Sequence, residues 1–114
     1  MRYAIVIYES PVALEARSEP EYRAAYTAYI RALSEAGVLL AGAGLQPAVT
    51  ATTLRIQNGK RQVQDGPYAD TKEELGGFLL IEVPDLDKAL EWAARCPSLA
   101  NGVVEVRPAL PPLN

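Results

Sequence analysis

Apolar runs separated by polar segments along the chain predict four main strands. Residues 3–8, the β-branched and aromatic run YAIVIY, end at Ser10-Pro11, which is typical of a first strand. The runs VLLAGAGLQP (38–47), GFLLIEV (77–83) and GVVEVRP (102–108) predict three more. In the second of these strands, Gly42 and Gly44 remove side chains from one face and leave room for a ligand to approach the backbone.

Two longer segments show helical spacing. Ser18 and Glu21 have the spacing of a capping box, and Gly37 is a C-terminal cap, so the first helix is expected between them. The apolar positions of this segment recur three to four residues apart: Tyr22, Tyr26, Tyr29, Ile30 and Leu33. We interpret the tyrosine stripe as core and dimer packing. Pro84-Asp85 begins a second helix, which Pro97 ends.

Asn58-Gly59 lies between two short alternating runs, TTLRIQ (52–57) and RQVQ (61–64). This dipeptide suits the two-residue turn of a β-hairpin, because both of its residues tolerate a positive φ. Without the hairpin the order is strand, helix, strand, strand, helix, strand. We therefore predict a single α+β domain over residues 1–114, with a ferredoxin-like split βαβ fold and an inserted β-hairpin.

The two faces of the predicted sheet differ in character. In residues 77–83, Leu79, Ile81 and Val83 form a purely apolar set that should lie under the helices. The opposite sets are apolar with a few charges, and residues 3–8 are apolar on both faces. A bare second face would expose a large apolar patch to water, so we expect a homodimer that packs sheet against sheet.

Composition and charge exclude several classes of function. The chain has 114 residues and a net charge of −3, and its basic residues are scattered, which disfavours nucleic acid as a partner. Its longest apolar run is far short of the ~20 residues of a membrane span, and we expect a cytoplasmic protein. With one cysteine (Cys96) and no histidine, the sequence predicts no metal site.

The stretch QDGPYADTKEELGGF (64–78) crowds turn and cap signals together. Asp65-Gly66-Pro67 predicts a turn in which the Asp65 carboxylate accepts from backbone amides ahead of it. The spacing from Asp70 to Glu73 suits a capping box that starts one helical turn, which Gly76-Gly77 would end. This structural interpretation explains each residue. The functional alternative is an anion site at the helix start beside Lys72, with Asp65 and Tyr68 where the loop meets the sheet.

The same stretch, followed by LIEVPDLDKALEWAAR and VEVRP, resembles the YCII-related proteins, in particular the branch named for its DGPF motif. The resemblance covers nearly the whole chain. Two positions depart from the usual DGPFAETKE: Tyr68 replaces Phe, and Asp70 replaces Glu. The resemblance implies a dimeric α+β barrel built from ferredoxin-like subunits, in agreement with the two sheet faces.

The resemblance says less about function. Some relatives carry a histidine–aspartate pair proposed to be catalytic, and one relative is a dehydrochlorinase of chlorinated hydroxylated aromatics. A chain without histidine cannot carry that pair, so a general base here would be a carboxylate or a tyrosinate. Genes of the DGPF branch often lie near those of extracytoplasmic-function sigma factors, which suggests a regulatory setting.

On the sheet face away from the helices, Glu82, Glu105 and Arg107 lie among apolar residues. Arg107 is expected to pair with a carboxylate on a neighbouring strand. One explanation is a charge network that fixes the dimer register. The other is a ligand cleft between subunits, for which Gly42 and Gly44 give space. Both explanations follow from the same pattern of a few charged residues on an apolar sheet face.

Two hypotheses of function result. In the first, a dimer binds a small polar or aromatic metabolite in that cleft, with cofactor-free lyase-like or isomerase-like acid–base chemistry in which Asp65 or Glu82 is the first carboxylate to test. The ligand-binding residues predicted are Tyr8, Asp65, Tyr68, Lys72, Glu82 and Arg107. In the second, the protein is a non-catalytic regulatory module that acts on a sigma factor. A concave pocket with unpaired polar atoms would favour the first hypothesis.

Overall fold

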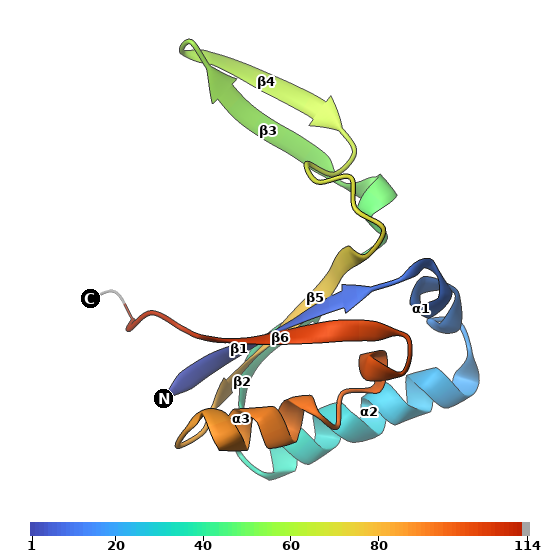
Figure 1. Cartoon of the computed structure of the whole chain (residues 1–114), viewed down its shortest axis with the longest axis vertical. Coiled ribbons are helices and arrows are strands. Elements are labelled where there is room, and N and C mark those ends of the chain that lie inside the picture. Colours follow the sequence, from blue (N-terminus) through green and yellow to red (C-terminus); the bar gives the residue numbers. More distant parts are fainter. Residues whose placement is uncertain (113–114) are drawn as a thin grey trace.

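The structure, a computed structural model, describes residues 1–112 (Figure 1). Two short 3-10 turns, Ala48–Thr50 and Pro97–Ala100, accompany nine helices and strands within those residues. These are β1 (Arg2–Glu9), α1 (Pro11–Ala16), α2 (Pro20–Glu35), β2 (Leu39–Gly44), β3 (Thr52–Gln57), β4 (Lys60–Asp65), β5 (Glu74–Glu82), α3 (Leu86–Ala93) and β6 (Gly102–Pro108). Across residues 1–112, no helix is long and apolar enough to cross a membrane.

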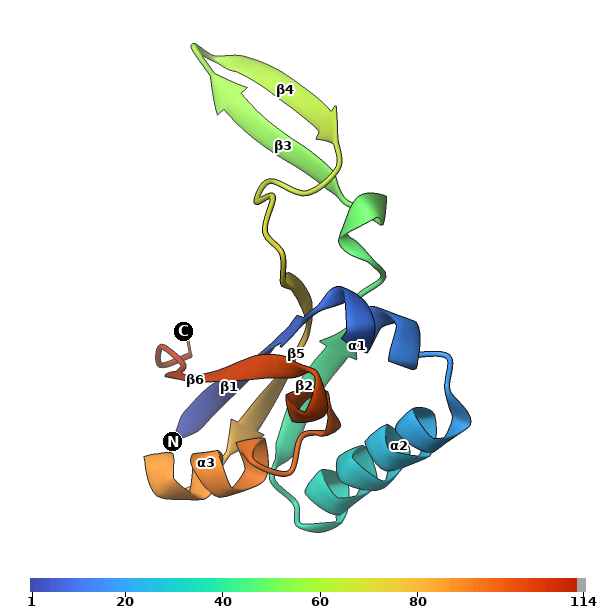
Figure 2. The same ribbon diagram turned by 45° about the vertical axis from the view of Figure 1, so that its right-hand side comes forward.

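The main sheet has the strand order β2-β5-β1-β6, and every neighbouring pair is antiparallel. This order and the two crossover helices confirm the predicted ferredoxin-like α+β fold. Helices α2 and α3 lie on the same side of the sheet, as both views show (Figures 1 and 2). The expected hairpin is also present as β3 and β4, which form a sheet of their own.

The core fills the space between the sheet and the two helices. The predicted apolar set of β5 is buried there, and so are the matching positions of β1 and the inner faces of α2 and α3. The buried hydrophobic residues of the core are Tyr3, Ile5, Ile7, Tyr29, Leu33, Leu79, Ile81, Val83, Ala89, Ala93 and Cys96. Period-two alternation in the strands thus located the core correctly.

The other face of the sheet is uncovered within residues 1–112. Val6 lies opposite Phe78, and Tyr8 lies opposite Val103, so these side chains share that face. Phe78 and Val103 are exposed, while Val6 and Tyr8 are half-buried. The homodimer expected to cover this face stays a prediction.

The helical segment after β1 differs from the predicted one. A separate helix α1 follows Ser10, whose hydroxyl accepts from the amide of Ala13 at 3.3 Å. Helix α2 begins at Pro20 with Glu19 as its N-cap residue, and Ser18 donates to the carbonyl of Glu15 at 3.2 Å. The expected Ser18 capping box was therefore wrong, because the Ser18 hydroxyl is engaged by the helix that precedes it.

The connection between β4 and β5 contains no helical turn. Residues 70–73 are irregular, and the Thr71 hydroxyl donates to the carbonyl of Glu73 at 2.5 Å. Gly76 and Gly77 do not end a helix but lie inside β5. They are required by close packing, since a Cβ at Gly76 would overlap the Glu9 carboxylate and one at Gly77 would lie 2.7 Å from the carbonyl oxygen of Ala43. The helix start predicted beside Lys72 is absent from this described segment.

Other predicted ends and turns agree with the structure. Gly37 has a φ of 73° at the end of α2, and Asn58 and Gly59 have φ values of 52° and 73° in the hairpin turn. The C-terminal tail forms neither helix nor strand over residues 109–112, and Leu113 and Asn114 lie outside the described residues.

Candidate functional site

A cleft of about 800 Å³ opens between α2 and the β2–β5 edge of the sheet. Its opening depends on the small residues of β2. A Cβ at Gly44 would meet no atom within 4 Å, so this position leaves open space, whereas at Gly42 the side chain of Leu79 takes the space. The apolar lining includes Ile7, Ile30 and Leu39. The cleft therefore lies on the helix side of the sheet, in the monomer itself.

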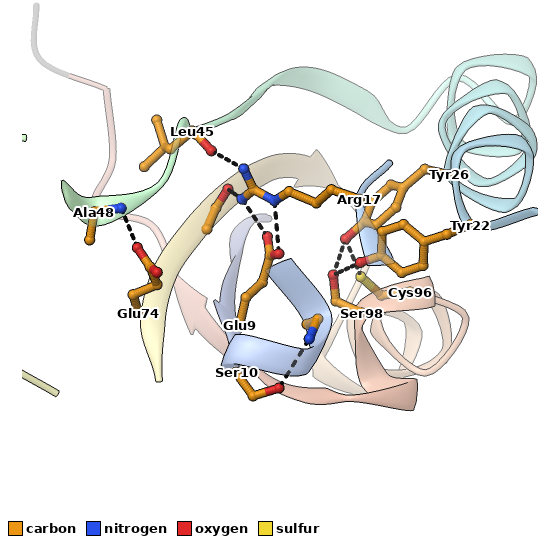
Figure 3. Close-up of polar contacts among 12 residues, drawn as sticks. Glu9, Ser10, Arg17, Tyr22, Tyr26, Leu45, Ala48, Glu74, Cys96 and Ser98 are labelled. Carbon is orange, nitrogen blue, oxygen red and sulfur yellow. Dashed lines mark hydrogen bonds and ion pairs between the residues drawn. The ribbon is translucent and has the colours of Figure 1, made fainter. Parts of the chain in front are cut away.

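An ion pair between the buried Glu9 and the half-buried Arg17 forms the polar floor of the cleft (Figure 3). The guanidinium of Arg17 donates from Nε to Glu9 Oε2 at 2.9 Å and from Nη2 to Glu9 Oε1 at 2.7 Å. It also donates from Nη1 to the carbonyl of Leu45 at 2.5 Å and from Nη2 to the carbonyl of Gly76 at 3.2 Å. The hydrogen bond to Glu9 raises the pKa of Arg17 above its ordinary value. Arg17 thereby joins β1 to the ends of β2 and β5.

Two tyrosines of α2 form an aromatic wall of the cleft. The rings of Tyr22 and Tyr26 pack edge to face with centroids 5.3 Å apart. Both hydroxyls bond to the hydroxyl of the fully buried Ser98, and the Tyr26 hydroxyl also lies 3.3 Å from Cys96 Sγ (Figure 3). Burial raises the pKa of Tyr26 well above its usual range. This ring therefore carries a protonated hydroxyl at neutral pH and not a tyrosinate.

The mouth of the cleft has a net positive charge. Arg23 lines the cleft, is exposed, and makes no ion pair within residues 1–112. The charge of Arg17 is balanced by Glu9, so Arg23 supplies the unbalanced charge. In the described part of the chain, no group of three histidine, cysteine or carboxylate side chains could hold a metal ion.

The six residues predicted to bind a ligand do not line this cleft. Tyr8, Glu82 and Arg107 lie on the opposite, uncovered face of the sheet. There Glu82 pairs with Arg2 at 3.2 Å and not with Arg107. The predicted Arg107 pair is therefore absent from the described residues, because Ala4 and not a carboxylate lies opposite Arg107.

The other three residues lie at the base of the hairpin or just after it. Asp65 ends β4, and its carboxylate makes no hydrogen bond within residues 1–112. The predicted bond from the turn to Asp65 is therefore absent from these residues. The turn is closed instead by the Gly66 amide, which donates to the carbonyl of Ala51 at 2.7 Å. Tyr68 is exposed, and the guanidinium of Arg55 lies 5.2 Å from its ring centroid. Lys72 is also exposed. The structure does not bring these residues together with those of the sheet face.

Sequence reasoning missed Glu9 and Arg17. One signal was available, because Glu9 continues the buried alternation Tyr3, Ile5, Ile7 of β1. A carboxylate in a buried set needs a buried cation. Nothing in the sequence indicated which arginine would supply it. Tyr22 and Tyr26 were interpreted as core, although only Tyr29 is fully part of it.

Comparison with known proteins gives the family. The model of the YCII-related domain matches residues 1–111. The chain belongs to the YCII family. An uncharacterised protein of Rhizobium meliloti (strain 1021) is 42% identical over 114 residues, which is 95% of this chain and 91% of the relative.

One solved YCII-like structure shares the fold. It is the 5-chloro-2-hydroxyhydroquinone dehydrochlorinase TftG from Burkholderia phenoliruptrix AC1100, in complex with 2,5-dihydroxybenzoquinone. The two chains superpose with a TM-score of 0.60 at 20% identity, over 96% of this chain and 94% of the other. At this identity the likeness concerns the fold.

In this YCII domain the stretch at residues 64–78 reaches the cleft at its C-terminal end, where Gly76, Gly77 and Phe78 line it. Glu74 accepts a hydrogen bond from the amide of Ala48, and so ties β5 to the turn that follows β2 (Figure 3). Gly76 leaves room for the Glu9 carboxylate, and its carbonyl accepts from Arg17. The second half of the stretch is thus a structural support of the ion pair on the cleft floor.

Proposed function

We propose that the cleft between α2 and the β2–β5 edge binds a small, planar, anionic aromatic metabolite. One observation carries this proposal: an apolar and aromatic cleft contains two arginines, of which only one is neutralised by a carboxylate. Ligand sites are typically apolar cavities with a few convergent polar groups, and this cleft has the size of such a site.

Arg17 is suited to orient the ligand. A guanidinium has five N–H donors, and four of those of Arg17 are directed at Glu9, Leu45 and Gly76. Within the described residues, one N–H on Nη1 remains for an incoming acceptor. Because the other four bonds hold the guanidinium in place, this donor is already oriented before the ligand binds.

Arg23 and the tyrosine rings are suited to the rest of such a ligand. Arg23 is an exposed cation that can contact an ionised hydroxyl or carboxylate at the mouth of the cleft. The edge-to-face pair of Tyr22 and Tyr26 offers a surface for a flat ring. The fold relative was solved with 2,5-dihydroxybenzoquinone, which is planar and carries ionisable hydroxyl groups. That ligand is a rational first probe.

The geometry supports binding and polarisation of the ligand better than proton abstraction. Both oxygens of Glu9 accept from Arg17, so this carboxylate is a poor general base. Burial raises the pKa of Tyr26, so its hydroxyl stays protonated and is a poor general base as well. Asp65 and Glu82, the carboxylates first expected to act as a base, lie outside the cleft. A second cleft at the sheet face and a sigma factor partner both stay predictions.

Isothermal titration calorimetry with 2,5-dihydroxybenzoquinone tests the proposal. Arg23→Gln should weaken binding at least about tenfold, since a charge-assisted hydrogen bond to an anion contributes about 1.5–3 kcal/mol. Arg31→Gln is the matched control, because Arg31 is also an exposed arginine of α2 but does not line the cleft. It should leave affinity unchanged.

Gly44→Val provides an independent test of the location. The added side chain would enter the open space beside Gly44 without overlapping the protein, so binding should be lost while the melting temperature stays near that of the wild type. Equal binding by the wild type, Arg23→Gln and Gly44→Val would contradict the proposal, and so would no binding by the wild type.

A further inference from the structure

The hairpin of β3 and β4, called the arm from here on, has one apolar face and one polar face. Leu54 lies opposite Val63 and Ile56 opposite Arg61, so these side chains share one face. The other face holds Arg55 opposite Gln62, with further polar residues on either side. Such a division is typical of a sheet that packs one face against protein.

The apolar face of the arm is uncovered within the described residues. Leu54, Ile56 and Val63 are 57%, 72% and 57% exposed. The arm stands away from the main sheet in both views (Figures 1 and 2), and among the strands of residues 1–112, β3 and β4 pair only with each other. The radius of gyration is 15.9 Å, larger than the about 13 Å of a compact domain of this size. A lone two-stranded hairpin is marginally stable in water, so this arm needs a second surface.

Charge favours a second copy of this chain as that surface. The arm has three cations (Arg55, Lys60 and Arg61) and one carboxylate (Asp65), which is a net charge of +2. The whole chain has a net charge of −3, so the rest of it has −5. The arm of one copy and the body of another therefore have opposite net charges and attract each other.

We infer that the arm of each subunit packs its apolar face on the uncovered sheet face of a second copy. That face carries exposed Phe78 and Val103 beside Val6. A twofold dimer is self-complementary, so one symmetric contact covers the arms and the sheet faces of both copies.

The buried area of a stable dimer requires contact by both the arms and the sheet faces. Strands of six residues are about 20 Å long and about 4.8 Å apart, so the face of one arm covers about 200 Å². Two arms and the surfaces they cover then bury about 800 Å² in total, which is less than the about 1,200 Å² of a specific interface. Contact between the sheet faces supplies the remainder. The arms are thus clamps that add to a sheet-to-sheet contact.

A photo-crosslinking experiment tests the contact directly. Ile56 is replaced by p-benzoylphenylalanine, and this protein is mixed with an isotopically labelled copy so that mass spectrometry separates crosslinks within a chain from those between chains. Crosslinks should join residue 56 to the labelled copy near Val6, Phe78 or Val103. The same probe at Gln57, on the polar face of the arm, should give at least about tenfold fewer.

Sedimentation equilibrium of a Leu54→Lys and Val63→Lys double variant gives a second readout. Both side chains are exposed in the single chain, so the variant should fold normally while its dimer dissociation constant rises at least about tenfold. A wild type that stays monomeric at micromolar concentration would overturn the inference. Crosslinks from residue 56 only within one chain, or only to other surfaces, would also overturn it.

Discussion

At the residue scale, two ion pairs within residues 1–112, Glu9 with Arg17 and Arg2 with Glu82, have different environments. The side chain of Glu9 is 6% exposed and that of its partner Arg17 is 28% exposed. Arg2 and Glu82, across β1 and β5, are 44% and 51% exposed. Exposed pairs contribute at most about 1 kcal/mol, while removing one partner of a buried pair leaves a charge that water cannot reach. The buried pair should therefore matter far more for stability.

This contrast gives a paired prediction for urea unfolding. Arg17→Met should lower the free energy of unfolding by about 3 kcal/mol, because Glu9 is then buried without its cation. Arg2→Met makes the same substitution in the exposed pair and should cost less than about 1 kcal/mol. Equal losses in the two variants would contradict the assignment of Glu9 and Arg17 as the polar floor of the cleft.

At the element scale, two aspartates that the sequence places at the start of a helix or of a turn have different roles. Asp85 is the N-cap of α3, and its carboxylate accepts from the amide of Lys88 at 2.9 Å. Asp65 precedes a glycine turn but makes no such bond within residues 1–112. We expect Asp85→Ala to lower the free energy of unfolding by about 1 kcal/mol and Asp65→Ala to change it by less than about 0.5 kcal/mol. Thermal and urea unfolding of both variants would check this, and the reverse order would contradict it.

Most elements could be predicted from the sequence because local signals agree with tertiary packing. The β1, β5 and β6 strands follow from their apolar, β-branched runs, and the hairpin follows from Asn58-Gly59. The predictions failed where a local signal competed with a distant contact. Residues 70–73 have the spacing of a capping box, but Glu74 bonds to the amide of Ala48, and Gly76 lies against Glu9. These contacts hold this part of the chain extended as it enters β5.

At the scale of the whole molecule, the sheet separates two surfaces with different roles. The helix side holds the cleft with Arg17 and Arg23, and the other side holds the uncovered face that we assign to the second copy. The sequence predicted the apolar second face, and the ligand cleft that it predicted on that face stays a prediction. The position of the cleft depends on the spacing between α2 and β2, which no local pattern encodes. Of the features of this cleft, the sequence predicted only the open space beside Gly44.

The most direct test of the cleft as the ligand site is a map of amide chemical shifts in ¹⁵N-labelled protein titrated with 2,5-dihydroxybenzoquinone. We predict saturable shifts centred on Tyr22, Arg23 and Gly44, with little change at Val6 and Val103 on the opposite sheet face. Shifts centred on that opposite face, or no saturable shifts, would contradict the account.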